Sequence, residues 1–277
     1  MNLIRIIKDA FLFPSKNAER FAVYLLLSVL MVLFAVGGVF TYSFGIINAE
    51  NYLIGGIYLI IAMLIGFIIA GYHIKVIKSG IGLDDEVPVF QLYEDFMTGF
   101  DYFVVSIFHF IIPAFIVALV AYDTNIFGNA MAAFQEVFLQ AFNVYIAGSS
   151  VNIAVNAISY ALTNLVNSLA VTIAVALVLF AIFLIILLIA QARLANTCSL
   201  KDGLNIFESL KDIKRIGVGR LILLILLVLA IMVIIEIILV VVFNHFSLLL
   251  SVGYIIITPY FVLVIQRALG LLYSDIA

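Results

Sequence analysis

Charged residues are scarce in this sequence. Only 10% of its 277 residues are Asp, Glu, Lys or Arg, whereas 66% are hydrophobic. A soluble domain has about 25% charged residues, so the composition excludes a water-soluble globular fold, a disordered chain and a nucleic-acid-binding protein. The sequence therefore predicts an integral membrane protein, with membrane lipid as its surroundings.

Cysteine and tryptophan are almost or wholly missing. Cys198 is the only cysteine, which excludes an intramolecular disulfide and a thiolate cluster around zinc or an iron–sulfur centre. Because tryptophan is absent, aromatic anchoring at the membrane interfaces falls to the 13 tyrosines. We expect neither a metal nor a cofactor.

Long apolar runs are abundant. A helix needs about 20 apolar residues to cross a hydrocarbon core of about 30 Å. Tyrosines bracket two of the runs, Tyr52 and Tyr72 one and Tyr102 and Tyr122 the next, as an interfacial belt requires. The prediction is an all-α integral membrane protein, a single membrane domain over residues 1–277. Its six spans are expected at residues 21–47, 52–72, 102–122, 169–190, 221–243 and 246–265.

Basic residues indicate the orientation, because Lys and Arg are retained on the cytoplasmic side of the membrane. With six spans, all 13 basic residues fall on one side, and none lies between Lys78 and Arg193. An odd number of spans would scatter them over both faces. We therefore predict a multi-pass protein of the cell membrane with both termini in the cytoplasm.

Amphipathic segments flank the spans. Residues 2–13 place Leu3, Ile7 and Phe11 on one helical face and Lys8 on the other, before Pro14. This pattern favours an interfacial helix, or equally a helix packed on the protein's own loops. Similar patterns follow the second span, from a first helical residue at position 88 to a glycine at 99, and the fourth span, at residues 206–217.

The two cytoplasmic loops share a layout: a basic residue, an acidic turn, an amphipathic helix and a glycine. This order suggests a parallel internal repeat about an axis along the membrane normal, although so few identities are no more than chance allows. At an offset of 118, Lys75 falls on Arg193, and the identical pairs are Asp84 with Asp202, Leu92 with Leu210 and Gly99 with Gly217.

The exterior segment, residues 123–168, is predicted to be helical. Its first part, residues 126–146, has Phe and Ala at helical spacing. Its second part carries an uncharged polar stripe that includes Asn152 and Asn156. Such a stripe could line a hydrated passage for a small solute. A helical hairpin with its amides in water is the favoured interpretation.

Short motifs link the chain to a known family. Gly71-Tyr72-His73-Ile74-Lys75, Ala192-Arg193-Leu194-Ala195 and the terminal Arg267-Ala268-Leu269-Gly270 resemble those of the "domain of unknown function 4013" family. This resemblance implies a multi-pass membrane protein of the kind common in methanogenic archaea. Where the family tends to show Leu-Pro followed by an acid, this chain has Val87-Pro88-Val89. No activity follows from the resemblance.

Two ionisable residues lie deep inside predicted spans. Glu236 stands among isoleucines, where a charge costs a few kcal/mol, so a role in transport is one hypothesis. Ser251 or Tyr254 could hydrogen-bond it. His109 lies roughly 10 Å deep, at a different depth from Glu236. The alternative for each is a buried polar group that bonds to a neighbouring helix.

Small residues favour close helix contacts, as at Gly37 and Gly38 of the first span and Gly55, Gly56 and Gly71 of the second. Internal packing explains them better than a dimer seam.

Enzyme signatures are missing, since the sequence has no Gly-x-Ser-x-Gly, no His-Glu-x-x-His and no phosphate-binding loop. No catalytic residue is therefore predicted. The acids of residues 84–86 could hold a hard cation, but a solvated acidic loop is favoured.

Three functions fit these features. The favoured one is a non-enzymatic membrane component or scaffold that organises a lipid or a complex, as a homo- or hetero-oligomer. The second is a channel or carrier for a small solute or ion, based on Glu236, His109, Tyr254 and the two asparagines of the stripe. The third is a lipid-modifying enzyme at the cytoplasmic face.

Overall fold

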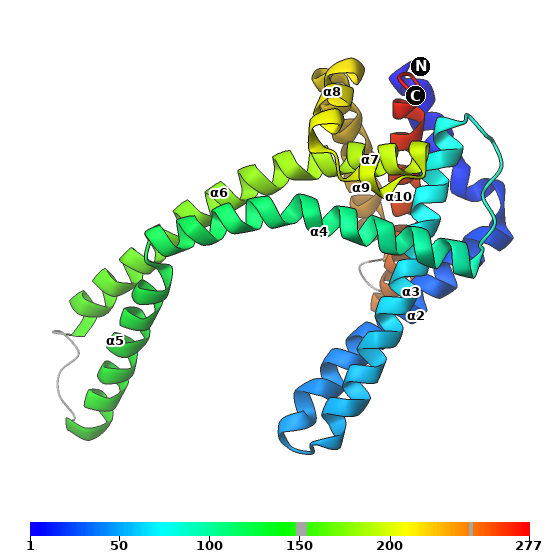
Figure 1. Cartoon of the computed structure of the whole chain (residues 1–277). Coiled ribbons are helices and arrows are strands. Elements are labelled where there is room, and N and C mark those ends of the chain that lie inside the picture. Colours follow the sequence, from blue (N-terminus) through cyan, green and yellow to red (C-terminus); the bar gives the residue numbers. More distant parts are fainter. Residues whose placement is uncertain (148–153, 244–245) are drawn as a thin grey trace. The chain divides into compact units, whose positions relative to one another are not determined.

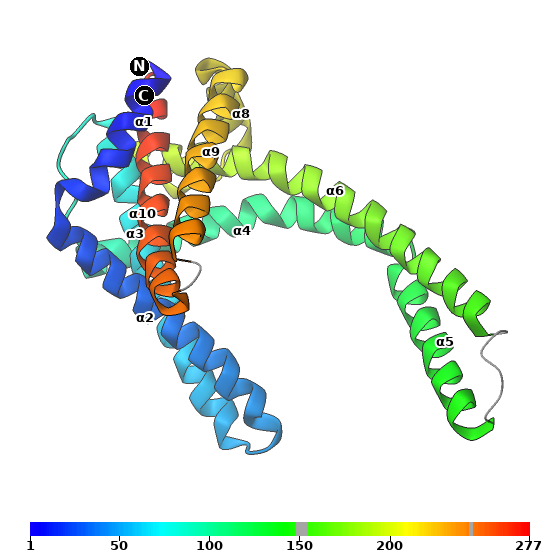
Figure 2. The same cartoon turned by 180° about the vertical axis from the view of Figure 1, so that it is seen from behind.

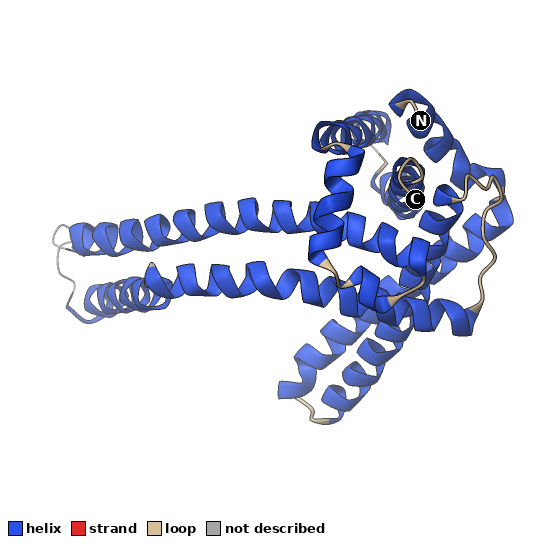
Figure 3. Ribbon diagram, turned by 45° about the horizontal axis from the view of Figure 1, so that its top comes forward, coloured by secondary structure: helices blue, strands red, loops and turns tan. Residues whose placement is uncertain are grey.

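A computed structural model describes residues 1–147, 154–243 and 246–277, which contain helices and no strand (Figure 3). The elements in chain order are α1 (Leu3–Leu12), η1 (Phe13–Lys16), α2 (Ala18–Ser43), η2 (Phe44–Ile46), α3 (Glu50–Ile81), α4 (Leu92–Asp123), α5 (Ile126–Ala147), α6 (Ala154–Thr197), α7 (Leu200–Gly203), α8 (Ile206–Ile216), α9 (Val218–Phe243) and α10 (Ser247–Tyr273).

Six of these helices are long and apolar enough to cross a membrane: α2, α3, α4, α6, α9 and α10. They coincide in order with the six predicted spans. The all-α, six-span fold class is therefore confirmed.

Several helices extend beyond the predicted spans. α3 continues to Ile81, past the predicted limit at residue 72, and α10 continues to Tyr273, past the predicted limit at residue 265. Both helices run past basic residues, Lys75 and Arg267, whose side chains pair with carboxylates. A charge ends an apolar run but does not end a helix, because Lys and Arg are good helix formers.

Two predicted helix boundaries are wrong. The expected separate helix from Pro88 does not form, because Val87 is buried and the Phe90 ring stacks on Tyr72 at 3.8 Å, which holds this segment in the core without helical structure. The second exterior helix is not separate from the fourth span either. α6 runs without a break from Ala154 to Thr197, since it contains neither glycine nor proline.

The chain divides into two compact units. Unit 1 comprises Met1–Ser106 and Ile186–Ala277, and unit 2 comprises Ile107–Ile185. In unit 1, α3 packs along α2 and against α10, while α1 lies along α10 (Figures 1 and 2). The core of this unit includes Phe13, Tyr24, Tyr72 and Leu263. Tyr72 is fully buried, so the prediction that it belongs to an interfacial belt is wrong.

Glycines allow the helices of unit 1 to touch through their backbones. A Cβ atom at Gly71 would lie 1.8 Å from the Asp95 carbonyl oxygen, and one at Gly99 would lie 1.7 Å from that of Phe67. At Gly55 it would lie 2.6 Å from the Tyr42 nitrogen. These distances confirm the predicted internal packing at Gly55 and Gly71.

Unit 2 contains α5 and the adjoining parts of α4 and α6. Short polar contacts join them: the hydroxyls of Thr124 and Thr172 are 3.2 Å apart, and Asn129 donates to Ser168 Oγ at 3.2 Å. The rings of Phe134, Phe138 and Phe142 on α5 stack in a row and are exposed.

We predict that Gly71→Ala destabilises the protein by about 1–3 kcal/mol, because the added methyl group overlaps the backbone of α4. The measurement is the apparent melting temperature of detergent-solubilised protein, followed by size-exclusion chromatography. Gly56→Ala is the matched control, since a Cβ atom there would meet nothing within 4 Å. Equal melting temperatures for the two variants would contradict the close crossing of α3 and α4.

Candidate functional site

Both termini and α8 lie at one end of unit 1 (Figures 1 and 2), and charged side chains form ion pairs there. We call this region the polar end. Burying a charge in an apolar protein is costly unless the charge is paired and hydrogen-bonded. The polar end is built from several such pairs.

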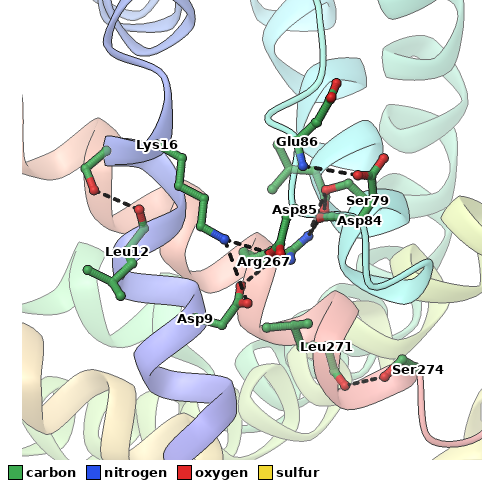
Figure 4. A network of polar contacts seen from close by, with 12 residues as sticks. Asp9, Leu12, Lys16, Ser79, Asp84, Asp85, Glu86, Arg267, Leu271 and Ser274 are labelled. Carbon is green, nitrogen blue, oxygen red and sulfur yellow. Dashed lines mark hydrogen bonds and ion pairs between the residues drawn. The ribbon is translucent and has the colours of Figure 1, made fainter.

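Arg267 of α10 is the largest of the fully buried side chains at the polar end, with 1% of its surface exposed. Its Nε donates to Asp9 Oδ1 at 3.0 Å, while Nη1 donates to the Asp84 carbonyl at 2.7 Å and to Ser79 Oγ at 3.2 Å (Figure 4). Its guanidinium lies 4.4 Å from the centroid of the Phe13 ring. One side chain thus joins α1, η1, α3, α10 and the segment 82–91.

Lys16 extends this network. Its ammonium donates to Asp85 at 2.8 Å and lies 3.9 Å from Asp9 (Figure 4). The hydrogen bond from Lys16 holds the pKa of the Asp85 carboxyl below its usual range. The acidic turn of residues 84–86 therefore fastens the amino-terminal segment to α10, in addition to facing solvent.

A buried acid, Asp212 of α8, is 1% exposed. Arg193 donates to its Oδ2 at 2.5 Å, Tyr273 donates to the same oxygen at 2.8 Å, and Arg215 donates to Oδ1 at 3.2 Å. The carboxylate thereby links α6, α8 and α10.

The second buried acid, Asp95 of α4, is fully buried. Lys75 of α3 lies 2.7 Å from its Oδ1, and its Oδ2 accepts the backbone N–H of Gln91 at 2.7 Å. Lys75 and Arg193 occupy equivalent positions at the sequence offset of 118. Each forms an ion pair with a buried aspartate of the amphipathic segment that follows it. This likeness agrees with the layout shared by the two loops, and the internal repeat itself stays a prediction.

The described residues contain no cluster of three or more His, Cys, Asp or Glu side chains that could hold a metal ion. The buried acids of the polar end are instead bonded to lysine, arginine, tyrosine or backbone groups. Their arrangement can fix helices in place.

The predicted transport residues belong to different units. Glu236 lies exposed on α9 in unit 1, and Tyr254 lies on α10 with 38% of its surface exposed. Between described residues Glu236 forms no hydrogen bond or ion pair, so the expected bond from Tyr254 is not made. His109 belongs to unit 2, where it is fully buried beside Phe108.

The polar stripe is described only in part. Asn152 lies outside the described residues, and Asn156 lies near the start of α6. Farther along α6, Ser159 and Thr163 are exposed and line a shallow cavity of about 470 Å³ together with Ile158, Leu162 and Val166. This cavity is not lined by Glu236.

The ion pairs of the basic residues were not predicted from the sequence. Lys75, Arg193 and Arg267 served to orient the chain and to define the shared loop layout and the family motifs, although each stands within or beside an apolar helical run. That position was the available signal, because a charge flanked by buried residues needs a partner. The acid that pairs with each basic residue could not be predicted, because the partners can lie far apart in the sequence, as Asp9 and Arg267 do.

Comparison with known proteins identifies a family. The family model for a protein of unknown function (DUF4013) matches residues 54–244, more than half of the chain. The matched range includes Lys75, Asp95, Arg193 and Asp212, whereas Asp9 and Arg267 lie outside it. No curated protein and no solved structure matches the chain.

We predict that Asp212→Asn lowers the stability of the folded protein by about 3–5 kcal/mol, because it leaves the Arg193 guanidinium without its buried counter-charge. The melting temperature in detergent measures this loss. Glu208→Gln serves as the control, since Glu208 pairs with the largely exposed Lys211 on the same helix and should change the melting temperature little. An unchanged melting temperature for Asp212→Asn would show that the pair does not stabilise the polar end.

Proposed function

Since the chain belongs to the DUF4013 family of proteins of unknown function, which carries no assigned activity, we propose a function from its own geometry. The protein is a non-enzymatic component of the cell membrane with both termini in the cytoplasm. It organises membrane lipid or a protein complex at its polar end, alone or as an oligomer.

The pairing of buried charges carries this proposal. Arg267, Asp212 and Asp95 are almost fully buried, and each is bonded to an opposite charge on another segment. Removing one partner of such a pair would leave a buried charge uncompensated, so these groups hold helices in place and are withdrawn from reaction with a substrate. A catalytic acid or base, in contrast, keeps a titratable atom accessible to substrate.

The distribution of basic residues supports the orientation. All 13 belong to unit 1, and Arg267, Lys16 and Arg193 lie together with the termini at the polar end. Charges retained on the cytoplasmic side would place that whole end in the cytoplasm.

We predict that a membrane-impermeant maleimide modifies Cys198 in inverted vesicles but not in intact cells. Cys198 is suited to this test because it is the only cysteine and is exposed just after α6. The control is Tyr122→Cys in a Cys198→Ser background, since Tyr122 is 82% exposed at the other end of α4 and should react in intact cells. Labelling of Cys198 from outside intact cells would overturn the orientation.

We further predict that proteoliposomes containing the purified chain release entrapped ions and small neutral solutes no faster than empty liposomes, and leave their lipids chemically unchanged. Release is measured with entrapped fluorescent dyes, and the lipids are examined by mass spectrometry. If the proteoliposomes release solute faster than empty liposomes, and Glu236→Gln abolishes this release, the protein is a channel or carrier instead. A new lipid product that depends on the acids of residues 84–86 would establish the enzyme.

A further inference from the structure

A cavity of about 370 Å³ lies between three helices of unit 1. We call it the three-helix cavity. Its size falls within the range of small-molecule sites, about 300–1,000 Å³. Its lining comes from α3, α4 and the end of α6, namely Ile74, Lys75, Lys78, Tyr93, Glu94, Met97, Thr98, Asp101, Leu194, Ala195 and Cys198.

The cavity has an apolar floor and a charged rim. Ile74, Leu194 and Ala195 are buried, whereas Tyr93 and Met97 are exposed at the entrance. Lys75 and Lys78 also line a second cavity of about 730 Å³ that reaches Asp84 and Pro88. The two lysines thus stand where the two cavities meet.

The charged side chains on the rim differ in whether they have an ion-pair partner. Lys75 is neutralised by the buried Asp95 at 2.7 Å. Lys78 forms no ion pair with a carboxylate of any residue that the structure describes, and its ammonium donates to the Cys198 sulfur at 3.1 Å. Asp101 likewise has no cationic partner in the described part of the chain. One cation and one anion therefore remain available in the same cavity, and Glu94, 3.6 Å from Lys75, adds a second carboxylate.

We propose that the three-helix cavity binds the headgroup of a zwitterionic phospholipid, a phosphodiester that carries a primary ammonium group. Lys78 binds the phosphate, while Asp101 and Glu94 accept hydrogen bonds from the ammonium, and Thr98 adds a hydroxyl beside them. A primary ammonium suits this rim because it donates three hydrogen bonds. A purely anionic headgroup is disfavoured by the two carboxylates.

The position of the cavity favours a lipid over a soluble ligand. It lies at the ends of membrane-spanning helices, where α3 and α6 finish and α4 begins, and headgroup sites form between such helices. Tyr93, with 77% of its surface exposed, stands at its edge as an interfacial aromatic residue would. The exposed side chains of Leu92 and Met97 give acyl chains an apolar path along α4.

The native Cys198 reports on occupancy. We expect phosphatidylethanolamine in nanodiscs to slow the reaction of Cys198 with maleimide roughly tenfold relative to phosphatidylcholine nanodiscs, because a bound headgroup covers the thiol. Phosphatidylglycerol and soluble glycerophosphoethanolamine are compared at matched concentrations. Equal protection by phosphatidylcholine or phosphatidylglycerol would overturn the headgroup class. Equal protection by glycerophosphoethanolamine would show that the ligand need not be a lipid. If none of these compounds protects Cys198, the cavity is not a headgroup site.

Variants test the two ends of the headgroup separately. Lys78→Met and Asp101→Asn should each remove most of the protection, whereas Lys201→Met, an exposed lysine outside the cavity, should retain it. Each variant is compared with and without phosphatidylethanolamine, so a direct effect of Lys78 on the thiol cancels. Native mass spectrometry of folded, monodisperse protein gives a second reading of lipid binding. Retained protection in both cavity variants would overturn the assignment.

Discussion

The pairing of charge inside an apolar protein is the constraint on which the polar end depends. Arg267 is almost completely withdrawn from water, so its charge must be balanced by groups brought from elsewhere in the chain. Asp9 and the Asp84 carbonyl do this, and in doing so they fix the amino-terminal helix and the segment 82–91 against α10. Asp212 and Asp95 repeat the arrangement with other helices.

Periodicity and hydropathy were enough to predict the six spans, because a helix in lipid must be apolar over its crossing length. They do not give the helix ends. The apolar runs end near the charges of Lys75 and Arg267, whereas α3 and α10 continue past them, and only tertiary contacts show that these charges are paired. The separate helix expected from Pro88 does not form, and the reason is again a tertiary contact. Stacking of Phe90 on Tyr72 outweighs the local helical signal.

The candidate site was less predictable than the fold. Glu236 drew attention because a charge among isoleucines is unusual, yet it lies exposed on α9 and lines none of the three cavities described above. The three-helix cavity left no motif in the sequence, because its rim combines Lys78, Asp101 and Cys198 from three distant segments. Residue type alone identified Cys198 as unique, and only the structure places the Lys78 ammonium beside it.

The length of α6 has a consequence for the thickness of membrane that the protein can occupy. Its 44 residues extend about 66 Å, more than twice the hydrocarbon core, and even the steepest common tilt leaves an excess. Ser159, Thr163 and Asn167 form a wettable face near its amino-terminal end, whereas Arg193 is fastened at the other. A thicker or thinner bilayer would therefore move the water boundary along that wettable face, and hydrophobic mismatch would be absorbed at one leaflet only.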